Sequence, residues 1–594
     1  MSRTPRPVFF GPRERPCFGW IHLAEGGNRS VGLVLCKPFG YEGICAQRSV
    51  RHFAEHAAAI GLPAIRFDYE GTGDSAGSDR DPARVDAWVR SVHAAIDELK
   101  RRSGVTRVIV LGLRLGATLG ALASAERSDV ASFIGIAPVV SAKAYLRELR
   151  ALQMALALSP PPEGFRAPEG EREAAGFAIS AETQEKLTTV DLARAPVRPA
   201  GRVLLLDRDD LPMCEGWAKA LRAAGDEVDH QRVQGFTELV LDPHHAQVPD
   251  SIVRLCMAFM RESLERAAPA EGIATSVAVD ESDTSQAEFV VDGVRIRETA
   301  AWLSAEHPLF GVLSEPAAAP SGPRKAFLLL NSGAIHHIGP NRMYVALARS
   351  WAARGHTVLR ADLSGLGDSK PRPGEAENVV YSSHAQEDVG DALAFLQSRP
   401  GVSKVYAVGL CSGAYNSFKA AVAGHRMHGV VPINPLIFFW KEGMSLDLPQ
   451  QHEVVQDAQR YSRMVRRGDA WKRLFTGRVK LSRVAEVLLQ QSGILLAGYA
   501  RGIGRRLGRP FPDDLGVELE IVADRDINMQ FIFAAADPGV ELLRVQGGRT
   551  VQRLAESGKL ARHFITGANH TFTAIWMQEE LSSTLATVIS SFPA

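Results

Sequence analysis

A cysteine stands where an apolar strand would turn sharply into a helix. Residues 409–413 read Gly-Leu-Cys-Ser-Gly. This Gly-x-nucleophile-x-Gly pattern is typical of a nucleophile elbow, because the turn leaves no room for side chains two residues either side of the nucleophile. It predicts Cys411 as the nucleophile and Ser412 as an oxyanion-hole donor through its backbone N–H. The alternative is a free cysteine buried as a small apolar residue.

A thiol nucleophile needs a base, and the base needs a group that orients it. In this kind of fold the chain order is nucleophile, acid, histidine. Asp537 follows an apolar strand-like run at 530–536, and His570 follows a second one ending near 565. We therefore predict Asp537 as the acid and His570 as the base. A turn-forming Asp-Pro-Gly and a surface histidine remain the alternative.

The second oxyanion donor should come from the loop after the strand at 326–330. That loop, 331–340, is rich in small residues. We assign Gly333 and Ala334 as donors, because backbone without bulky side chains can approach a substrate closely. For His336 and His337 we expect a local structural role, because a metal site there lacks further ligands.

The chain contains an internal repeat. Residues 66–75 match 360–369, and residues 108–117 match 405–414, at offsets of 294 and 297. Two matches in the same order at nearly the same shift indicate a duplicated domain. Within each copy, buried strands alternate with helices, which predicts parallel α/β sheets.

A small, polar stretch at 266–286 separates the two copies and is predicted to be a linker. Copy one then spans 1–265 and copy two 287–594. Copy two opens with two alternating runs, 288–297 and 309–313, which predict a hairpin at the sheet edge.

Copy one lacks the residues of a nucleophilic site. Arg114 occupies the nucleophile position, Glu238 aligns with the histidine, and the acid position remains acidic, as Asp210. We expect these three to form a charge cluster in a degenerate site, because a bidentate arginine–carboxylate contact would pair the buried charges. A base shifted to His244 or His245 stays open. Copy one is predicted to be structural or partner-binding.

A long insertion in copy two, about 436–516, lies between predicted strands at 429–434 and 517–522 and is predicted to be a lid. It begins with the apolar run 436–440, which is predicted to line a pocket. Residues 460–509 contain thirteen Lys or Arg against two acids. Such a basic segment would suit an acyl carrier protein or the phosphates of coenzyme A. A solvated charged face, or contact of 484–500 with an anionic membrane surface, are the alternatives.

Composition narrows the class of protein. The 594 residues carry a formal net charge of +1 and are 45% hydrophobic and 23% charged, which is ordinary globular composition with no general basicity for nucleic acid. Six cysteines without Cys-x-x-Cys spacing argue against a disulfide framework or zinc site. No segment has the length of a membrane span. We expect a cytoplasmic protein without cofactor or metal.

These motifs resemble the α/β-hydrolase superfamily over both copies. Copy one, through residues 9–12, 112–116 and 242–245, also resembles hydrolase-like proteins found beside bacterial exosortase systems. The resemblance implies an eight-stranded, mostly parallel sheet, a lid, and acyl chemistry on esters, thioesters or amides. A cysteine in place of the usual serine is similar to dienelactone hydrolases and polyhydroxyalkanoate synthases.

The sequence therefore predicts two tandem α/β-hydrolase domains, of which the second is an acyltransferase or thioesterase using Cys411, His570 and Asp537. A carrier-bound or coenzyme A-bound donor in a biosynthetic pathway is the leading expectation. The alternatives are a small-molecule esterase of the dienelactone type and a non-catalytic scaffold. The oligomeric state is left open.

Overall fold

The computed structural model describes residues 4–24, 30–156, 158–267, 285–304, 306–319, 322–441, 444 and 513–593. The chain forms two compact units. The first comprises Met1–Gly322, Gly333–Val380 and Thr573–Gln578, and the second Pro323–Ser332, Tyr381–Phe572 and Glu579–Ala594. The first unit thus joins copy one to an early part of copy two. The predicted boundaries at 265 and 287 were drawn from the internal sequence repeat, whereas these units are defined by compactness. The boundaries therefore stay a prediction.

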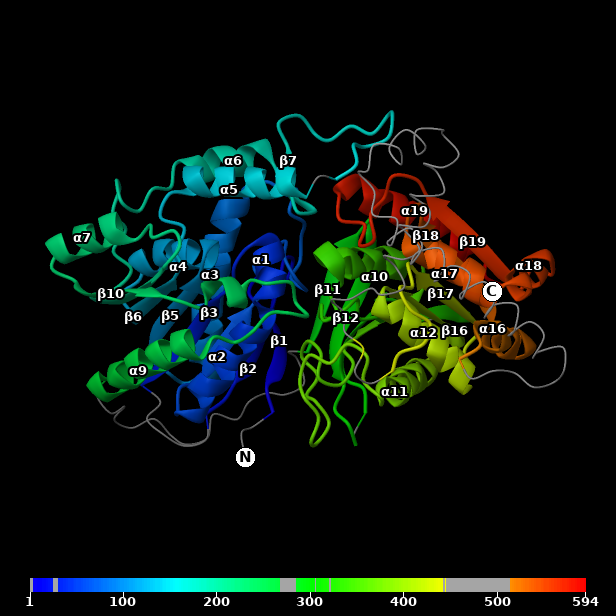
Figure 1. The fold of residues 1–594 in the computed structure, drawn as a ribbon. Coiled ribbons are helices and arrows are strands. Elements are labelled where there is room, and N and C mark those ends of the chain that lie inside the picture. The colour runs from blue at the N-terminus through cyan, green and yellow to red at the C-terminus, as the bar shows by residue number, and fades with distance from the viewer. Residues whose placement is uncertain are drawn as a thin grey trace, which may run out of the picture. The chain divides into compact units, whose positions relative to one another are not determined.

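Copy one contains an eight-stranded sheet (Figure 1). In chain order its strands are β1 (Arg6–Phe10), β2 (Cys17–His22), β3 (Val31–Cys36), β4 (Ala64–Phe67), β5 (Arg107–Leu113), β6 (Val130–Ile136), β9 (Arg202–Arg208) and β10 (Glu227–Val233). The spatial order is β1-β2-β4-β3-β5-β6-β9-β10. β2 runs antiparallel to both of its neighbours, and the pairs from β4 to β10 are parallel. The predicted mostly parallel sheet is confirmed for this copy.

Helices cover both faces of that sheet. They are α1 (Gly40–Cys45), α2 (Gln47–Ala59), α3 (Arg84–Ser103), α4 (Leu115–Ala125), α5 (Ala142–Ala155), α6 (Ala181–Thr188), α7 (Glu215–Ala223), α8 (Phe236–Leu239) and α9 (Asp250–Arg266), with a small hairpin of β7 (Arg172–Ala174) and β8 (Phe177–Ile179). Along β5, Val108 and Val110 pack in the core with α3, whereas Ile109 and Leu111 pack with α2 and α9. This alternation follows from the two-residue period of a strand.

The first unit also holds four antiparallel strands from copy two: β11 (Gln286–Val291), β12 (Val294–Trp302), β13 (Phe310–Pro316) and β15 (Thr357–Ala361). Asp292 and Gly293, with φ of 49° and 77°, turn β11 into β12. The first of the two predicted edge runs is therefore itself a hairpin, and β13 adds a third strand. The 3-10 turn η1 (Pro340–Arg342) and helix α10 (Met343–Ala353) precede β15.

The second unit contains five parallel strands in the order β14 (Arg324–Leu330), β16 (Val402–Leu410), β17 (Gly429–Ile433), β18 (Asn528–Ala534) and β19 (Leu560–Ile565). Its helices are α11 (Ala385–Gln397), α12 (Ser412–Ala423), α16 (Leu515–Asp524), α17 (Pro538–Gly547) and α18 (Arg549–Glu556). Helix α19 (Ile575–Ser591) begins in the first unit and ends in the second. Helix α12 packs against β16 and β17, and α16 packs against α12.

One predicted strand is wrong. Residues 517–522 were expected to be extended, but they lie inside α16. The Asp514 side chain accepts a hydrogen bond from the Gly516 amide (2.9 Å) and so caps this helix. The buried residues Leu515, Leu519 and Val522 recur every three or four positions, which is the period of a helix face.

The predicted lid lies almost entirely outside the described residues. Residues 436–441, 444 and 513–516 of it are described, and none of the basic segment 460–509 is. Among the helices in the described ranges, none combines the length and apolar character needed to cross a bilayer.

Candidate active site

Cys411 lies between β16 and α12 in a backbone conformation rarely adopted by L-residues, with φ 59° and ψ −113°. The flanking glycines make this turn possible. A Cβ on Gly409 would lie 2.2 Å from the Gly413 carbonyl carbon, and one on Gly413 would lie 2.8 Å from the Asn331 oxygen. Such strained residues cluster at functional sites. The elbow presents Cys411 partly exposed, while the other five cysteines are buried.

The corresponding turn in copy one has the same geometry but presents Arg114. Arg114 has φ 49° and ψ −125°. Its amide donates to the Ile136 carbonyl, as the Cys411 amide donates to the Ile433 carbonyl. Because both residues occupy the same place in their sheets, the predicted substitution of the nucleophile by arginine rests on structural as well as sequence equivalence.

The predicted acid and base are in contact in the second unit. Asp537 Oδ2 lies 2.7 Å from His570 Nδ1, and Asp537 Oδ1 accepts a hydrogen bond from the Gly539 amide (2.8 Å). Asp537 is therefore also the N-cap of α17, which fixes its carboxylate. The His570 side chain is 28% exposed, but its other ring nitrogen, Nε2, is buried.

The electrostatics of His570 connect it to Cys411. Burial lowers the pKa of His570, but the negative charge of Cys411 and the hydrogen bond to Asp537 outweigh burial and raise that pKa to about 10. The raised pKa favours the protonated imidazolium form of His570. An imidazolium beside a cysteine favours the thiolate, the reactive form of the side chain. The arrangement can hold a thiolate–imidazolium pair oriented by a carboxylate.

Asn434, which the sequence analysis did not single out, links the histidine to the sheet. Its Nδ2 donates to the His570 carbonyl (2.7 Å), and its Oδ1 accepts from the Ala534 amide (2.8 Å). The side chain is fully buried, and the backbone has φ 44°, a left-handed conformation that asparagine tolerates. Ala137 holds the same backbone conformation in copy one, with φ 45°, and cannot make these bonds.

Three aromatic side chains form a cluster in the second unit: Tyr381, Tyr415 and Trp440. Tyr381 stacks on Trp440 at a ring-centroid distance of 4.5 Å and meets Tyr415 edge-on at 5.2 Å. Burial, followed by the charges of Cys411 and Tyr415, raises the pKa of Tyr381 well above its usual value. Its hydroxyl therefore stays protonated near the nucleophile. Trp440 ends the apolar run predicted to line a pocket.

The remaining predicted oxyanion residues differ in what the structure says of them. Ser412 is the first residue of α12, and its buried hydroxyl donates to the Asn331 carbonyl (3.3 Å). Its hydroxyl thus has a structural partner. Gly333, with φ 57°, and Ala334 are half-buried residues of the loop that follows β14. They belong to the first unit, whereas Cys411 belongs to the second, so their role as donors stays a prediction.

The predicted charge cluster of copy one is wrong in its acidic members. The buried Arg114 guanidinium pairs with Glu42 (2.9 Å) and with Glu148. Asp210 is exposed and pairs with Arg208 (2.6 Å), and Glu238 is exposed on the short helix α8. Glu42 and Glu148 lie on α1 and α5, close enough to the elbow to contact the Arg114 guanidinium. Aligning the two copies by sequence does not reveal these neighbours, because they lie far from Arg114 in the chain.

The position of the acid also shifts. Ile136 pairs with Leu206 in copy one, as Ile433 pairs with Ile532 in copy two. Asp537 lies five residues after Ile532, and the residue five positions after Leu206 is Leu211. Leu211 is therefore the equivalent of Asp537, and Asp210 lies one residue before that position.

Comparison with known proteins gives one family match and many structural likenesses. The family described as "Serine aminopeptidase, S33", a hydrolase family, matches residues 46–163, which include the copy-one elbow. A search of the curated proteins returns no significant match.

Three solved structures illustrate the structural likenesses. Est1E from Butyrivibrio proteoclasticus with bound ferulic acid is 16% identical, covers 43% of this chain and 99% of its own, and has a TM-score of 0.32. The proline iminopeptidase of Mycobacterium smegmatis is 18% identical, covers 45% of this chain and 100% of its own, and has a TM-score of 0.33. XC6422 from Xanthomonas campestris, described as an α/β serine hydrolase without a lid, is 15% identical, covers 46% of this chain and 98% of its own, and has a TM-score of 0.29.

The strand order of copy one, its crossover helices and its strand–elbow–helix turn lie within or around the matched segment. In copy two, β12, β13 and β15 take the places in the chain that β1, β2 and β4 have in copy one. In the same way, β14 and β16 to β19 correspond to β3, β5, β6, β9 and β10. The chain therefore has the α/β-hydrolase fold, with mostly parallel sheets flanked by helices.

Proposed function

We propose that copy two is an acyl-transfer enzyme in which Cys411 accepts an acyl group from a thioester or ester. The observation that carries the proposal is an elbow cysteine in the same unit as a histidine whose Nδ1 lies 2.7 Å from the buried Asp537 carboxylate and whose pKa is raised by Cys411. The raised pKa of His570 favours its protonated form, which can donate a proton to a leaving group. The family match, to a hydrolase family, supports the broader class of hydrolase-fold enzyme.

The chemistry runs in two balanced steps. The Cys411 thiolate attacks the carbonyl carbon, an S–C bond forms, and the bond to the leaving thiol or alcohol breaks. His570 Nε2–H gives its proton to the leaving group and becomes neutral imidazole. It then removes a proton from the acceptor, which attacks the acyl-cysteine and releases the Cys411 thiolate. Asp537 keeps Nδ1 protonated throughout, so Nε2 is the nitrogen that exchanges protons.

A thioester donor is favoured for chemical reasons. A thiolate exchanges readily with a thioester, because the bond formed and the bond broken are alike, and the product keeps the group reactive toward an acceptor. The basic segment 460–509 supports a donor on an acidic carrier protein or on coenzyme A. The aromatic cluster of Tyr381, Tyr415 and Trp440 suits an apolar or planar acyl chain.

The test is intact-protein mass spectrometry after mixing with acyl-coenzyme A and acyl-carrier thioesters. Wild type and Ser412→Ala should gain the acyl mass, and Cys411→Ala should not. His570→Ala should slow deacylation and help trap the adduct if acylation still proceeds. Turnover of simple esters without a carrier would instead favour the small-molecule esterase. The absence of an adduct on every donor and every variant, with Cys411 shown to be alkylated by iodoacetamide, would overturn covalent catalysis and favour a scaffold.

A further inference from the structure

The repeated ten-residue motif makes reciprocal ion pairs between the two copies within the first unit. Arg66 of copy one pairs with Asp368 of copy two (2.7 Å), and Arg360 of copy two pairs with Asp74 of copy one. Arg66 corresponds to Arg360 and Asp74 to Asp368 in the repeat. In each copy, the arginine at the first position of the motif therefore pairs with the aspartate at the ninth position of the motif in the other copy. All four side chains are buried.

The motif can do this because it folds identically in both copies. In copy one, the Asp74 amide donates to Asp68 (3.0 Å) and the Ser75 hydroxyl to the Asp68 carbonyl (2.6 Å). The equivalent bonds in copy two, from residues 368 and 369 to Asp362, measure 2.9 and 2.7 Å. Gly73 and its counterpart allow the close turn, since a Cβ on Gly73 would lie 2.1 Å from the Asp68 carboxylate.

The helix before each motif extends the reciprocity. From α10 of copy two, Arg349 donates to the carbonyls of Asp74 (2.7 Å) and Ser75 (3.1 Å), beside similar bonds from Arg342. The equivalent helix of copy one is α2. Its residues Arg48, Arg51 and His52 contact Glu377 at 3.2, 2.9 and 2.8 Å, eight residues beyond the motif of copy two.

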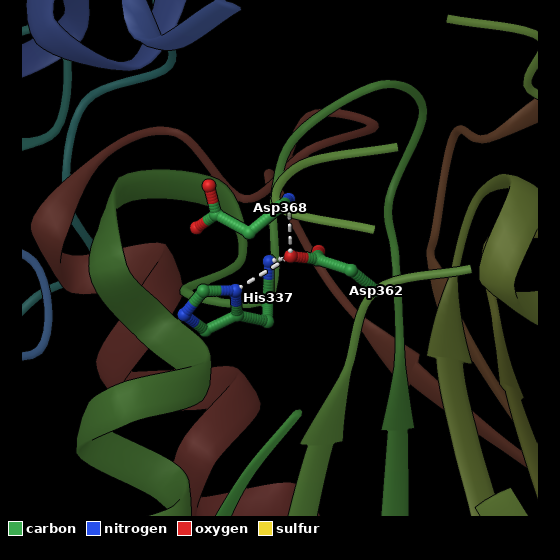
Figure 2. Close-up of side chains that lie close together, drawn as sticks. All are labelled: His337, Asp362 and Asp368. Atoms are coloured by element: carbon green, nitrogen blue, oxygen red, sulfur yellow. Dashed lines mark hydrogen bonds and ion pairs between the residues drawn. The ribbon is translucent and has the colours of Figure 1, made fainter. Parts of the chain in front are cut away.

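His337 closes the network. Its Nδ1 lies 2.7 Å from Asp362 Oδ2 in its own copy, and its Nε2 lies 2.7 Å from Asp74 Oδ2 in the other. Figure 2 shows the imidazole turned toward Asp362, with the Asp368 amide on the same carboxylate and the Asp368 carboxylate directed elsewhere. Burial lowers the pKa of His337, but Asp362 and Asp74 outweigh it and raise the pKa to about 10.

The buried charges of this network balance. Four anions face four cations: Asp74, Glu298, Asp362 and Asp368 against Arg66, His337, Arg349 and Arg360. His337, Asp362 and Asp368 have donor atoms within 4.8 Å of one another, a spacing compatible with a metal ion. Within this cluster Asp368 is already paired with Arg66, and Asp362 with His337. The cluster is therefore better suited to joining protein segments than to binding a cation.

An apolar core lies beside the network and draws on both copies. It includes Phe9, Phe18 and Trp20 of copy one and Phe289 and Phe310 of copy two. The Trp20 and Phe310 rings lie 4.6 Å apart, and the Phe9 and Phe289 rings 6.0 Å. A surface that combines an apolar core with complementary charges has the anatomy of a stable protein–protein interface.

We propose that this surface is an isologous dimer interface, carried over from two identical chains that are now fused, and that copy one is retained as the dimer partner of copy two. An isologous interface requires that residue i of one partner contact residue j of the other and that j contact i in return. The pairs Arg66–Asp368 and Arg360–Asp74 meet that requirement. Copy one has lost the nucleophile at position 114 but keeps every residue of the motif that contacts copy two.

The experiment severs the covalent connection in the full chain. A protease site is inserted within residues 268–284, the purified protein is cleaved, and the mass of the product is measured by size-exclusion chromatography with light scattering in 0.15 M salt. We expect the two fragments to remain together at the mass of the intact chain. Separation of folded fragments in the cleaved wild type would overturn the proposal.

Two charge-reversal variants of copy two test the contacts across the interface. Glu377→Lys, on the copy-two side, and Arg342→Glu, also in copy two but directed at the copy-one turn, should each weaken association of the cleaved fragments at least tenfold. Glu520→Lys, which removes an ion pair with Arg553 inside copy two, is the matched control and should leave association unchanged. Dissociation equal to wild type in both interface variants, with each variant folded by circular dichroism, would refute the proposal whatever the outcome of the acylation assay.

Discussion

Substitution of Asp537 separates its two roles, as orienting group for His570 and as cap of α17. Asp537→Asn keeps an oxygen that can accept from the Gly539 amide but loses the charge beside His570. Asp537→Ala loses both contacts. The side chain is 1% exposed, so solvent does not screen either interaction. The two variants therefore should differ in stability but share a defect in chemistry.

The magnitudes follow from the two bonds. Loss of an N-cap costs about 1 kcal/mol, and loss of a hydrogen bond to a charged group about 1.5–3 kcal/mol. We expect Asp537→Ala to lower the free energy of unfolding by about 2.5–4 kcal/mol and Asp537→Asn by about 1.5–3 kcal/mol. Removing the acid of a triad costs on the order of 10⁴-fold in turnover when the histidine tautomer is wrong. Both variants should approach that loss.

The assay uses the exposure of Cys411. The other five cysteines are buried, and burial raises the pKa of each of them, to about 11, 12 and 12 for Cys17, Cys36 and Cys45. Alkylation of the native protein by iodoacetamide therefore reports Cys411, and mass spectrometry counts the adducts. The hydrogen bond that His570 donates to Asp537 helps to raise the pKa of His570, so both variants should lose alkylation rate near pH 7 and recover it in alkali.

Urea unfolding at pH 7 supplies the stability arm and thermolysin digestion checks that the fold is intact. The reasoning is refuted if Asp537→Asn keeps wild-type alkylation between pH 6 and pH 9 while remaining folded. It is also refuted if the alanine variant is no less stable than the asparagine variant, because the cap would then contribute nothing.

Three further predictions address the site and its support. Asn434→Ala should lower turnover and reduce stability by about 1–3 kcal/mol, measured by urea unfolding, because it leaves the buried Ala534 amide and His570 carbonyl without their partner; an unchanged midpoint would contradict this. His337 and His570 have folded pKa values of about 10, above the usual 6.5, so the stability they contribute is fully present below pH 6.5 and is lost as pH rises toward 10. Unfolding at pH 6, 8 and 10 should show this loss, with a smaller slope in His337→Gln. Gly413→Ala should either prevent folding or displace the elbow so that Cys411 is no longer alkylated, because the new Cβ would lie 2.8 Å from the Asn331 oxygen. A variant with wild-type melting temperature and activity would contradict this and show that the turn can relax.

The parts predictable from sequence are those set by local spacing. The elbow at 409–413 depends on five adjacent residues, and Asp537 and His570 each follow an apolar run, so their places at strand ends could be anticipated. Residues 517–522 misled because their apolar residues suit either a strand or a buried helix, and Asp514 decides the matter by capping a helix. Short apolar runs carry this ambiguity in general.

The contacts that could not be predicted join residues far apart in the chain. Arg114 finds Glu42, 72 residues earlier, and Asn434 holds a carbonyl 136 residues later. A local structural role was expected for His337, and the contact with Asp362 fits that expectation, but its second partner, Asp74, lies 263 residues away in the other copy. No periodicity or motif encodes such pairings, because they depend on how finished sheets bring their loops together.

The two copies share the conformation of the elbow, although only copy two has a nucleophilic residue in it. Arg114 keeps the strained conformation of Cys411, with φ and ψ within about 12° of it, although arginine cannot accept an acyl group. The flanking glycines remain because β5 and α4 still have to pack at that angle: a Cβ on Gly116 would lie 2.2 Å from the Lys37 carbonyl oxygen. Retention of the elbow is therefore evidence for the fold and not for catalysis. What distinguishes copy two is the set of residues that the fold itself does not require: Cys411 in the turn, Asp537 and His570 beside it, and Asn434 where copy one has Ala137.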